Sequence, residues 1–214
     1  LSLHDALPIL KALRYTCENG TDLLLELPEG HIWQGGEEAS KDGTIFNANI
    51  PTEEIFSAPQ YNGVNGIVYS TKPLIYHGNT ISDFSFTFKE GKIVEYTAKE
   101  GYEVLKELVE TDEGSHYLGE VALVDHFSPI SQSNQIFYET LFDENASCHL
   151  AIGASYPTCL KNSDGLSDDE LKERGLNYSL THVDFMIGHE HMNIKGYTRD
   201  GQEVDIMIDG RLQV

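Results

Sequence analysis

The sequence is poor in cysteine and in basic residues, and both shortages exclude classes of protein. Its 3 cysteines, Cys17, Cys148 and Cys159, are irregularly spaced and include no C-x-x-C pair. Such a pattern supports neither a disulfide framework nor a zinc ribbon. Lys and Arg number 14 against 35 Asp and Glu, which gives a formal net charge of −21. Because phosphate binding requires concentrated positive charge, neither nucleic acid nor an anionic membrane is an expected partner.

Long apolar runs and several well-known motifs are also missing. No apolar run is long enough to span a bilayer, and no charged start leads into an apolar signal segment, so we expect a cytoplasmic protein. The sequence contains no G-x-x-x-x-G-K-[ST], no G-x-G-x-x-G after a predicted strand, no G-x-S-x-G and no H-E-x-x-H. Common local signatures of phosphate binding, dinucleotide binding and serine hydrolysis are therefore absent.

The length and composition suit one globular domain or at most two small ones. The 214 residues are 40% hydrophobic and 23% charged, which is enough apolar material for a core. The chain begins with Leu1, and the residues up to Ile9 bear no relation to the pattern that follows. We therefore expect residues 1–9 to be a leader that need not be native, and residues 10–214 to form the domain.

Strand patterns outnumber helical ones along the chain. Phe84, Phe86 and Phe88 alternate with polar residues ahead of Lys89-Glu90-Gly91, which predicts a hairpin over Ser82–Tyr96. This order predicts an α+β fold with a mostly antiparallel or mixed sheet, a few flanking helices and a strand-rich C-terminal third. Further strands are expected in Thr21–Leu27, twice within Asn62–His77, and in Tyr117–Val124, His149–Gly153, Thr181–Ile187, Met192–Thr198 and Glu203–Ile208.

Four segments carry helical patterns instead. Gly101–Thr111 has apolar residues at helical spacing. The segment Ser167–Glu170 matches the capping box that opens a short helix. Weaker helical patterns cover Ile9–Asn19 and Asn134–Asp143. By contrast, Gly30–Gly43 is rich in Gly, Glu and Ser, which predicts an exposed connection.

Residue types that bind metals occur at predicted strand positions. His182 and Asp184 lie two residues apart in one strand, so both side chains point to the same face. Alone this pair is a weak signal, because an ordinary hydrogen-bonded histidine gives the same pattern. Glu54, Glu120 and His149 stand in similar settings, and the five supply three carboxylates and two imidazoles. Two divalent ions that share a bridging carboxylate need about that many groups, with open positions for water and substrate.

Such a pair of ions would favour hydrolysis. It polarises a carbonyl group and lowers the pKa of a bound water until hydroxide attacks at neutral pH. From these residues alone the question stays open, because isolated glutamates are usually surface residues. His189, Glu190 and His191 form another candidate zinc site, but beside Gly188 they are better explained as a solvated corner.

Five segments resemble, in order along the chain, the motifs of one known family. They are Asn49–Phe56 (NIPTEEIF), Gly119–Val124 (GEVALV), Ser128–Ile130 (SPI), Leu141–Ala151 (LFDENASCHLA) and Thr181–Met186 (THVDFM). The family is that of the metal-dependent aminopeptidases typified by aminopeptidases T and S and by PepS. The resemblance runs from about Asp22 to the end of the chain.

The resemblance implies an exopeptidase that removes single amino acids from peptide N-termini. The reaction would use a hydroxide held by two divalent ions, with zinc or cobalt first and manganese or magnesium as further options. The partner would be a peptide with a free N-terminus, and the resemblance leaves a homodimer open. Position by position, it makes Glu54, Glu120, His149, His182 and Asp184 the metal ligands, with Glu120 as the bridge.

The resemblance also implies catalytic roles. Glu120 and Tyr156 are the catalytic candidates, and Tyr156 would lie beside the site and hydrogen-bond the tetrahedral intermediate. Glu53 is either a general base or a bystander, and we favour the bystander.

Two alternatives to this prediction stay open. Members of the family are about twice as long and carry an N-terminal domain that this chain lacks. The chain could therefore be a truncated, catalytically inactive metal-binding domain of the same fold. It could also be an acidic interaction domain without metal, and that alternative predicts that the five candidate ligands lie scattered.

Overall fold

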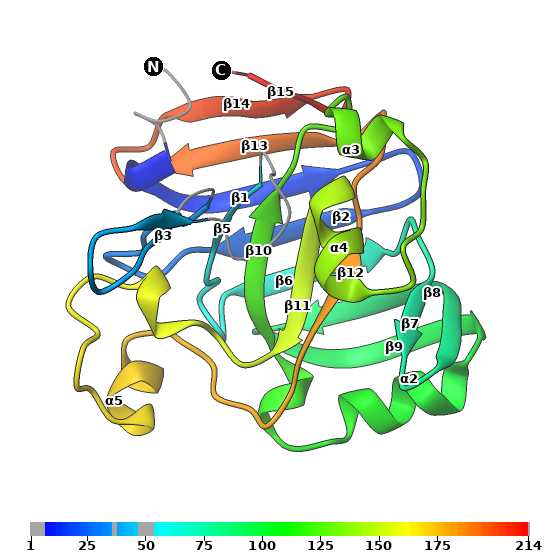
Figure 1. Cartoon of the computed structure of the whole chain (residues 1–214), viewed down its shortest axis with the longest axis horizontal. Helices are drawn as coiled ribbons and strands as arrows, with labels where there is room; N and C mark the ends of the chain where they lie inside the picture. The colour runs from blue at the N-terminus through cyan, green and yellow to red at the C-terminus, as the bar shows by residue number, and fades with distance from the viewer. Residues whose placement is uncertain (1–6, 36–37, 47–53, 214) are drawn as a thin grey trace.

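Two antiparallel β-sheets form the framework of the computed structural model, which describes residues 7–35, 38–46 and 54–213 (Figure 1). The larger sheet has nine strands. In spatial order they are β15 (Arg211–Leu212), β14 (Glu203–Ile208), β13 (Asn193–Thr198), β1 (Leu10–Thr16), β2 (Asp22–Glu26), β6 (Val64–Tyr69), β8 (Asn79–Lys89) and β7 (Leu74–Tyr76), and β9 (Lys92–Glu100) pairs with β8.

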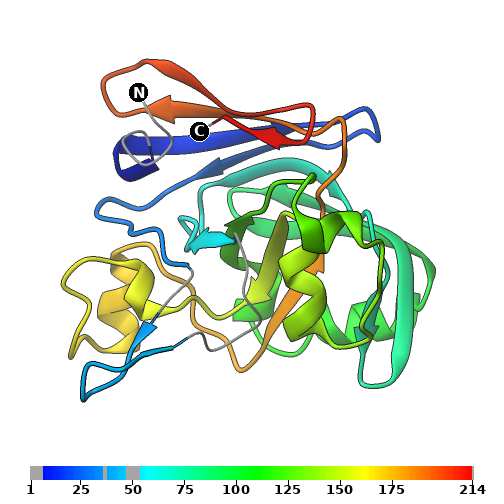
Figure 2. The same ribbon diagram turned by 45° about the horizontal axis from the view of Figure 1, so that its top comes forward.

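The smaller sheet has four strands, over which the larger sheet curves (Figure 2). Its order is β12 (His182–Met186), β11 (His149–Gly153), β10 (Leu118–Leu123) and β5 (Ile55–Ser57). Strand pairing within both sheets is antiparallel throughout the described residues. The predicted α+β fold with a mostly antiparallel sheet is therefore confirmed.

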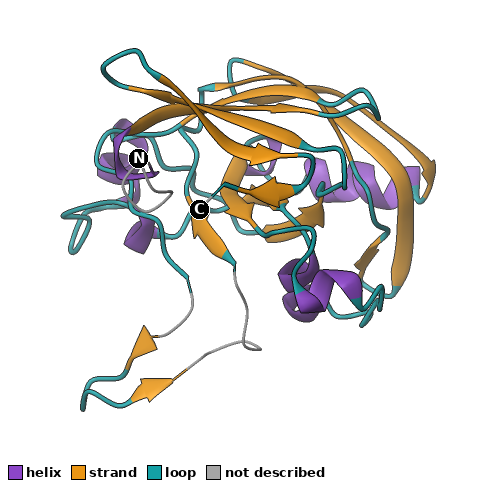
Figure 3. Cartoon of the chain, turned by 90° about the horizontal axis from the view of Figure 1, so that it is seen from above, coloured by secondary structure: helices purple, strands orange, loops and turns teal. Residues whose placement is uncertain are grey.

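The helices are few and short, as the sequence predicts. A separate two-stranded hairpin, β3 (Glu38–Ala39) with β4 (Ile45–Phe46), stands apart from the two sheets (Figure 3). Across the described ranges, no helix is long and apolar enough to cross a membrane. The α-helices are α2 (Tyr102–Val109), α3 (Pro129–Gln132), α4 (Thr140–Asp143) and α5 (Asp168–Glu173), and the 3-10 helices are η1 (Leu7–Ile9), η2 (Gly114–His116), η3 (Glu144–Ala146) and η4 (Pro157–Cys159).

The main core lies between the two sheets. Phe84 and Phe86 of β8 point at Phe185 of β12, with ring centroids 5.8 Å and 5.1 Å from that of Phe185. These aromatic contacts join the predicted phenylalanine hairpin to the strand that carries His182 and Asp184. Every residue of β10 and of β11 is buried. These two central strands are therefore covered on both faces, so a charged side chain on them is shielded from water.

The predicted helix over Ile9–Asn19 is wrong, because this segment forms strand β1. Its Leu10, Ala12, Leu13 and Tyr15 are all buried. A register shift between Leu10 and Ala12 interrupts the pairing of β1 with β13. A bulge of this kind breaks the strict alternation of a strand and produces apolar spacings that resemble those of a helix.

The predicted helix over Asn134–Asp143 is correct only for its last turn, Thr140–Asp143. Asn134 and Tyr138 have positive φ values of 52° and 59°, which a right-handed helix does not contain. The carboxylate of Asp143 accepts a hydrogen bond from the backbone N–H of Phe137 at 2.7 Å. This side-chain bond competes with helical pairing and favours a turn over residues 134–139.

The predicted exposed connection Gly30–Gly43 is only partly correct. Gly35 and Lys41–Gly43 are exposed, whereas His31 is buried and Trp33 donates a hydrogen bond to the carbonyl of Leu7 at 3.2 Å. The other two predicted helices are confirmed as α2 and α5, and the side chains and backbones of Ser167 and Glu170 exchange the expected capping-box bonds.

Asp112 joins the segment after α2 to the segment before β12. Its carboxylate accepts hydrogen bonds from the backbone N–H of Leu180 (2.6 Å), from the Ser179 hydroxyl (2.8 Å) and from the backbone N–H of Ser115 (2.8 Å). Burial acts to raise the pKa of Asp112, but these hydrogen bonds outweigh it and lower the pKa below its usual value. The carboxylate thus stabilises the approach to β12 in its charged form.

We expect Asp112→Asn to lower the free energy of unfolding at neutral pH by about 1 to 2 kcal/mol, because an amide cannot accept all of these hydrogen bonds. A carboxylate with a depressed folded-state pKa stabilises the fold above its unfolded-state pKa and loses that contribution as pH falls through the folded-state value. Urea unfolding measured at a series of pH values from neutral to acidic should therefore show the free energies of unfolding of wild type and variant converging as pH falls. Asp164→Asn, at an exposed carboxylate, is the matched control. A difference that is independent of pH would contradict this role.

Candidate metal centre

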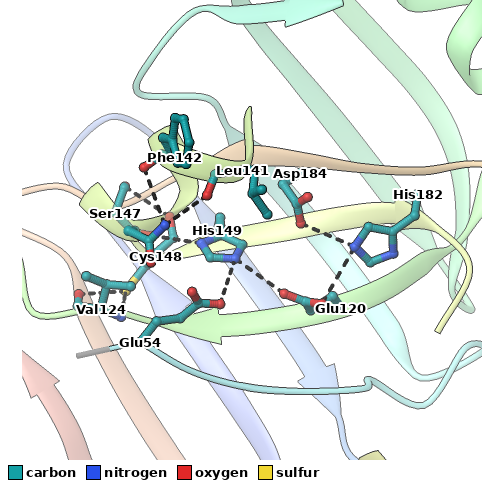
Figure 4. A network of polar contacts seen from close by, with 11 residues as sticks. Glu54, Glu120, Val124, Leu141, Phe142, Ser147, Cys148, His149, His182 and Asp184 are labelled. Atoms are coloured by element: carbon teal, nitrogen blue, oxygen red, sulfur yellow. Dashed lines mark hydrogen bonds and ion pairs between the residues drawn. The ribbon is translucent and has the colours of Figure 1, made fainter. Parts of the chain in front are cut away.

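The five candidate ligands come together on one face of the smaller sheet (Figure 4). Antiparallel pairing places Glu120 opposite Ala151, Ala151 opposite Asp184, and Gly153 opposite His182. Residues directly opposite one another share a face. The acidic interaction domain predicted scattered residues, so this convergence argues against it.

The residues between the candidate ligands on this face are small. Ala122 pairs with His149, and Ala151 and Gly153 occupy the neighbouring positions of β11. The alternate positions, which include Val121, Leu150 and Phe185, belong to the core between the sheets. Strand periodicity of two therefore separates a polar face, with little side-chain bulk between the ligands, from an apolar one.

The imidazoles lie between carboxylates. His149 Nε2 is 3.4 Å from Glu54 Oε1 and 3.3 Å from Glu120 Oε1. His182 Nε2 is 3.6 Å from Glu120 Oε2 and 3.5 Å from Asp184 Oδ1. Glu120 thus presents one carboxylate oxygen to each histidine, which is the arrangement expected of a bridging ligand.

Backbone carbonyls orient both rings. His149 Nδ1 lies 2.9 Å from the carbonyl oxygen of Ser147, and His182 Nδ1 lies 2.7 Å from that of Ala154. An Nδ1 that donates to a carbonyl leaves Nε2 as the donor atom for a metal. Both Nε2 atoms face the carboxylates, so each histidine is held in the tautomer that metal binding requires.

A sixth residue, Glu144 in η3, completes the cluster. Glu144, His149 and Asp184 each place a ligand atom within 4.8 Å of the others, and so do the sets Glu54, Glu120, His149 and Glu120, His182, Asp184. We did not predict Glu144 as a ligand, although it lies in the Leu141–Ala151 motif. One signal in the sequence points to Glu144: it is a carboxylate only five residues before the candidate ligand His149, which opens a predicted apolar strand.

The cluster concentrates negative charge away from water. Burial, followed by the charge of Asp184, raises the pKa of Glu144 to about 9. Burial also raises the pKa of Glu120. Burial alone would lower the pKa of His182, but Asp184 and Glu120 outweigh it and raise the pKa to about 9. The shifts thus arise from burial and from the negative charge of neighbouring carboxylates.

The donor set fits divalent ions. His149 Nε2 and Asp184 Oδ1 are buried and have no well-aligned hydrogen bond in the described part of the chain. The ion-pair distances of 3.3 Å to 3.6 Å around them show proximity without that alignment. Buried polar atoms without a partner are costly, and a cation would satisfy both. Carboxylate oxygens and imidazole nitrogens are ligands that zinc and similar divalent ions take.

The other predicted residues lie beside the cluster or outside it. The ring of Tyr156 packs 4.8 Å from that of His182, and the side chain is 47% exposed. Burial, followed by the charges of Glu120 and Asp184, raises the pKa of Tyr156 to about 12, so its hydroxyl keeps its proton at neutral pH. Glu53 lies outside the described residues. His191 is exposed in a turn, as a solvated corner predicts.

Comparison with known proteins identifies the family. The sequence profile of the thermophilic metalloproteases (M29) matches residues 5–212. The chain belongs to the M29 family. This confirms the predicted resemblance, and membership of a metalloprotease family implies a divalent metal cofactor.

Curated relatives of this M29 chain are named aminopeptidases. Aminopeptidase 2 of Geobacillus stearothermophilus is 55% identical over 191 residues, which are 89% of this chain and 46% of that protein. Aminopeptidase AmpS of Bacillus subtilis is 56% identical over 199 residues, which are 93% of this chain and 48% of that protein. The M29 chain described here thus spans about half the length of these relatives.

Solved structures share the fold of this M29 chain. Wild-type AmpT from Thermus thermophilus superposes with a TM-score of 0.91 at 42% identity, over 99% of this chain and 52% of that chain. A 2,5-dihydroxypyridine dioxygenase from Pseudomonas putida superposes with a TM-score of 0.63 at 12% identity, over 97% of this chain and 56% of that chain. At that identity the second likeness shows a common fold alone.

Proposed function

We propose that this chain is the metal-binding catalytic part of an aminopeptidase, which removes single amino acids from peptide N-termini with two divalent ions. The observation that carries the proposal is Glu120, whose two carboxylate oxygens face two different imidazoles. One ion would be held by Glu54, Glu120 and His149, and the other by Glu120, His182 and Asp184. Zinc or cobalt suits this donor set best, and manganese or magnesium is the second choice.

The residues of the chain have distinct roles in this proposal. When bound, the two ions polarise the scissile carbonyl and lower the pKa of the attacking water. Glu54, Glu120 and Asp184 would hold the ions and offset most of their positive charge, which leaves the centre able to take the free amine of a peptide N-terminus in its neutral form. Tyr156 keeps its proton and donates it in a hydrogen bond to the oxygen of the tetrahedral intermediate. Glu144 lies against His149 and Asp184 and is proposed as a further ligand.

A second candidate function is a metal-binding domain without catalytic activity. The chain described here spans about half the length of the aminopeptidases it resembles, so the activity of this part is tested separately from its metal binding. The donor set is the same in both proposals, so metal binding alone does not separate them. Location in the cytoplasm and assembly as a homodimer stay predictions from the sequence.

Hydrolysis of aminoacyl chromogenic substrates separates the two proposals. The purified chain would be stripped of metal and resupplied with zinc, cobalt or manganese. We expect release that depends on metal and that stops when the substrate amine is acetylated, because the proposed enzyme requires a free N-terminus. A folded chain that binds metal but releases nothing would overturn the catalytic proposal in favour of the inactive domain.

A further inference from the structure

Asn177 is a buried polar residue that joins three segments of the chain behind the metal centre. Its side chain is 5% exposed. The side-chain Nδ2 donates to the carbonyl oxygens of Gly153 at 2.7 Å and of Gly114 at 2.8 Å. Because both neighbours are carbonyl acceptors, the amide nitrogen must occupy this position. One amide group therefore ties the end of β11 to η2.

The backbone of Asn177 also holds the turn that follows β11. Its carbonyl accepts from the backbone N–H of Ser155 at 2.8 Å, and its N–H donates to the Ser155 hydroxyl at 3.1 Å. Ala154 N–H donates to the carbonyl of Thr181 at 2.8 Å. Three of these four hydrogen bonds on residues 153–155 involve Asn177, and Gly153 N–H also donates to the carbonyl of Tyr117 at 2.9 Å.

This turn touches the metal centre at two points. The carbonyl of Ala154 accepts the hydrogen bond from His182 Nδ1 that orients the imidazole. Tyr156, the proposed donor to the tetrahedral intermediate, follows directly after Ser155. A movement of the turn therefore changes both the orientation of the His182 imidazole, and with it the direction of Nε2, and the position of the Tyr156 hydroxyl.

The backbone is closely packed around the turn. Gly153 has a φ of 104°, and a Cβ at this residue would collide with the carbonyl of Thr181. A Cβ on Gly119 of β10 would collide with the carbonyls of Ala154 and Gly153. Both glycines are needed because backbone approaches backbone here. The support behind His182 is accordingly rigid, as an outer layer around a metal site must be.

We propose that Asn177 is a positioning residue for the metal centre, acting through the 153–155 turn on His182 and Tyr156. The inference rests on the proposed function of His182 as a ligand. Without the amide, the carbonyls of Gly114 and Gly153 lose the donor that links them, and the turn relaxes. The hydrogen bond from His182 Nδ1 to Ala154 then weakens, and the imidazole no longer points Nε2 at the site.

Cobalt binding tests this role without relying on hydrolysis. The visible absorption of Co²⁺ would be titrated into the full wild-type chain and into Asn177→Asp, which keeps the shape but places a carboxylate oxygen against two carbonyls. We expect Asn177→Asp to bind Co²⁺ about 10 to 100-fold more weakly, with an altered spectrum, as loss of outer-layer partners usually causes. Wild-type affinity and spectrum in this variant would overturn the proposal.

Thr198→Val separates positioning from general destabilisation. Thr198 is buried in β13 of the larger sheet, and its hydroxyl accepts a hydrogen bond from the backbone N–H of Gln202 at 2.9 Å. Loss of this bond should lower thermal stability while Co²⁺ affinity and spectrum stay those of wild type. If Thr198→Val weakens Co²⁺ binding as much as Asn177→Asp does, the effect is one of stability and the positioning role is overturned.

Ser155→Ala covers the case in which Asn177→Asp does not fold. It removes the hydroxyl that accepts from Asn177 N–H and leaves the amide contacts in place. We expect a weakening of Co²⁺ binding of a few-fold, and unchanged affinity would overturn the proposal.

The outcomes also separate the positioning role of Asn177 from the proposed function. A wild-type chain that binds Co²⁺ but hydrolyses nothing refutes the proposed function only, whereas wild-type affinity in Asn177→Asp refutes the positioning role only.

Discussion

Glu120→Gln is expected to abolish the aminopeptidase activity of the metal-loaded chain. Glu120 is the carboxylate whose two oxygens face His149 at 3.3 Å and His182 at 3.6 Å. An amide offers one oxygen and one NH2 group, which does not ligate a cation, so it cannot bridge two ions as a carboxylate does. The loss of rate should exceed the roughly 100-fold effect that removal of an outer-layer partner has on a metal site. Initial rates on an aminoacyl chromogenic substrate, at saturating zinc or cobalt, measure it.

Metal content should change together with this rate. Elemental analysis after dialysis is expected to show fewer bound ions in Glu120→Gln than in wild type, because both proposed sites share this residue. Glu95→Gln, at an exposed position of β9, is the matched control and should keep both the rate and the metal content. A Glu120→Gln variant with wild-type activity would refute the bridging role and the proposed mechanism with it.

Removal of metal is expected to lower the stability of the chain strongly. Carboxylates of Glu54, Glu120, Glu144 and Asp184 meet around two histidines in a buried space. Without cations the centre stays buried by taking up protons, because the pKa values of Glu144 and His182 are raised to about 9. Metal binding to the folded state alone adds about 3 to 4 kcal/mol at free metal concentrations of 100 to 1,000 times Kd. Thermal unfolding over a series of zinc concentrations should show Tm rising steadily with metal.

Variants show whether this effect arises at the proposed centre. His182→Ala should flatten the dependence of Tm on zinc, and Glu144→Gln should reduce it, which tests the ligand that the sequence prediction left out. Thr198→Val in the larger sheet should lower Tm at every zinc concentration and keep the full dependence. If His182→Ala retains the wild-type dependence, the stabilising ions bind elsewhere.

Local periodicity predicts much of the smaller sheet. His149–Gly153 was predicted as an apolar strand, and all its residues are buried. The spacing of His182 and Asp184 predicts that they share a face, and in the structure His182 Nε2 lies 3.5 Å from Asp184 Oδ1. The five candidate ligands could be grouped by residue type, but this left the question open until the family resemblance assigned them as ligands. Nothing in the spacing of Glu54 and Glu120 indicates that their strands lie close in space.

The errors arise where distant contacts decide the local structure. Strand β1 is paired on both sides, and its bulge against β13 hides the alternation that would have identified it. Glu144 reaches the centre because η3 turns it toward Asp184, a residue far along the chain. The bend over residues 134–139 depends on Asp143 accepting from Phe137. Helical propensity alone does not anticipate such contacts.

Side chains in β10, β11 and β12 alternate between two faces of the sheet, so a mutation has a different effect on each face. One set of positions holds the candidate ligands and the small residues between them, and the other set packs into the core. Substitutions in the first set therefore alter the metal site, and through bound metal the stability, whereas substitutions in the second set alter the packing between the sheets. A designer could change the ligands of this sheet one face at a time and keep the apolar face as the scaffold.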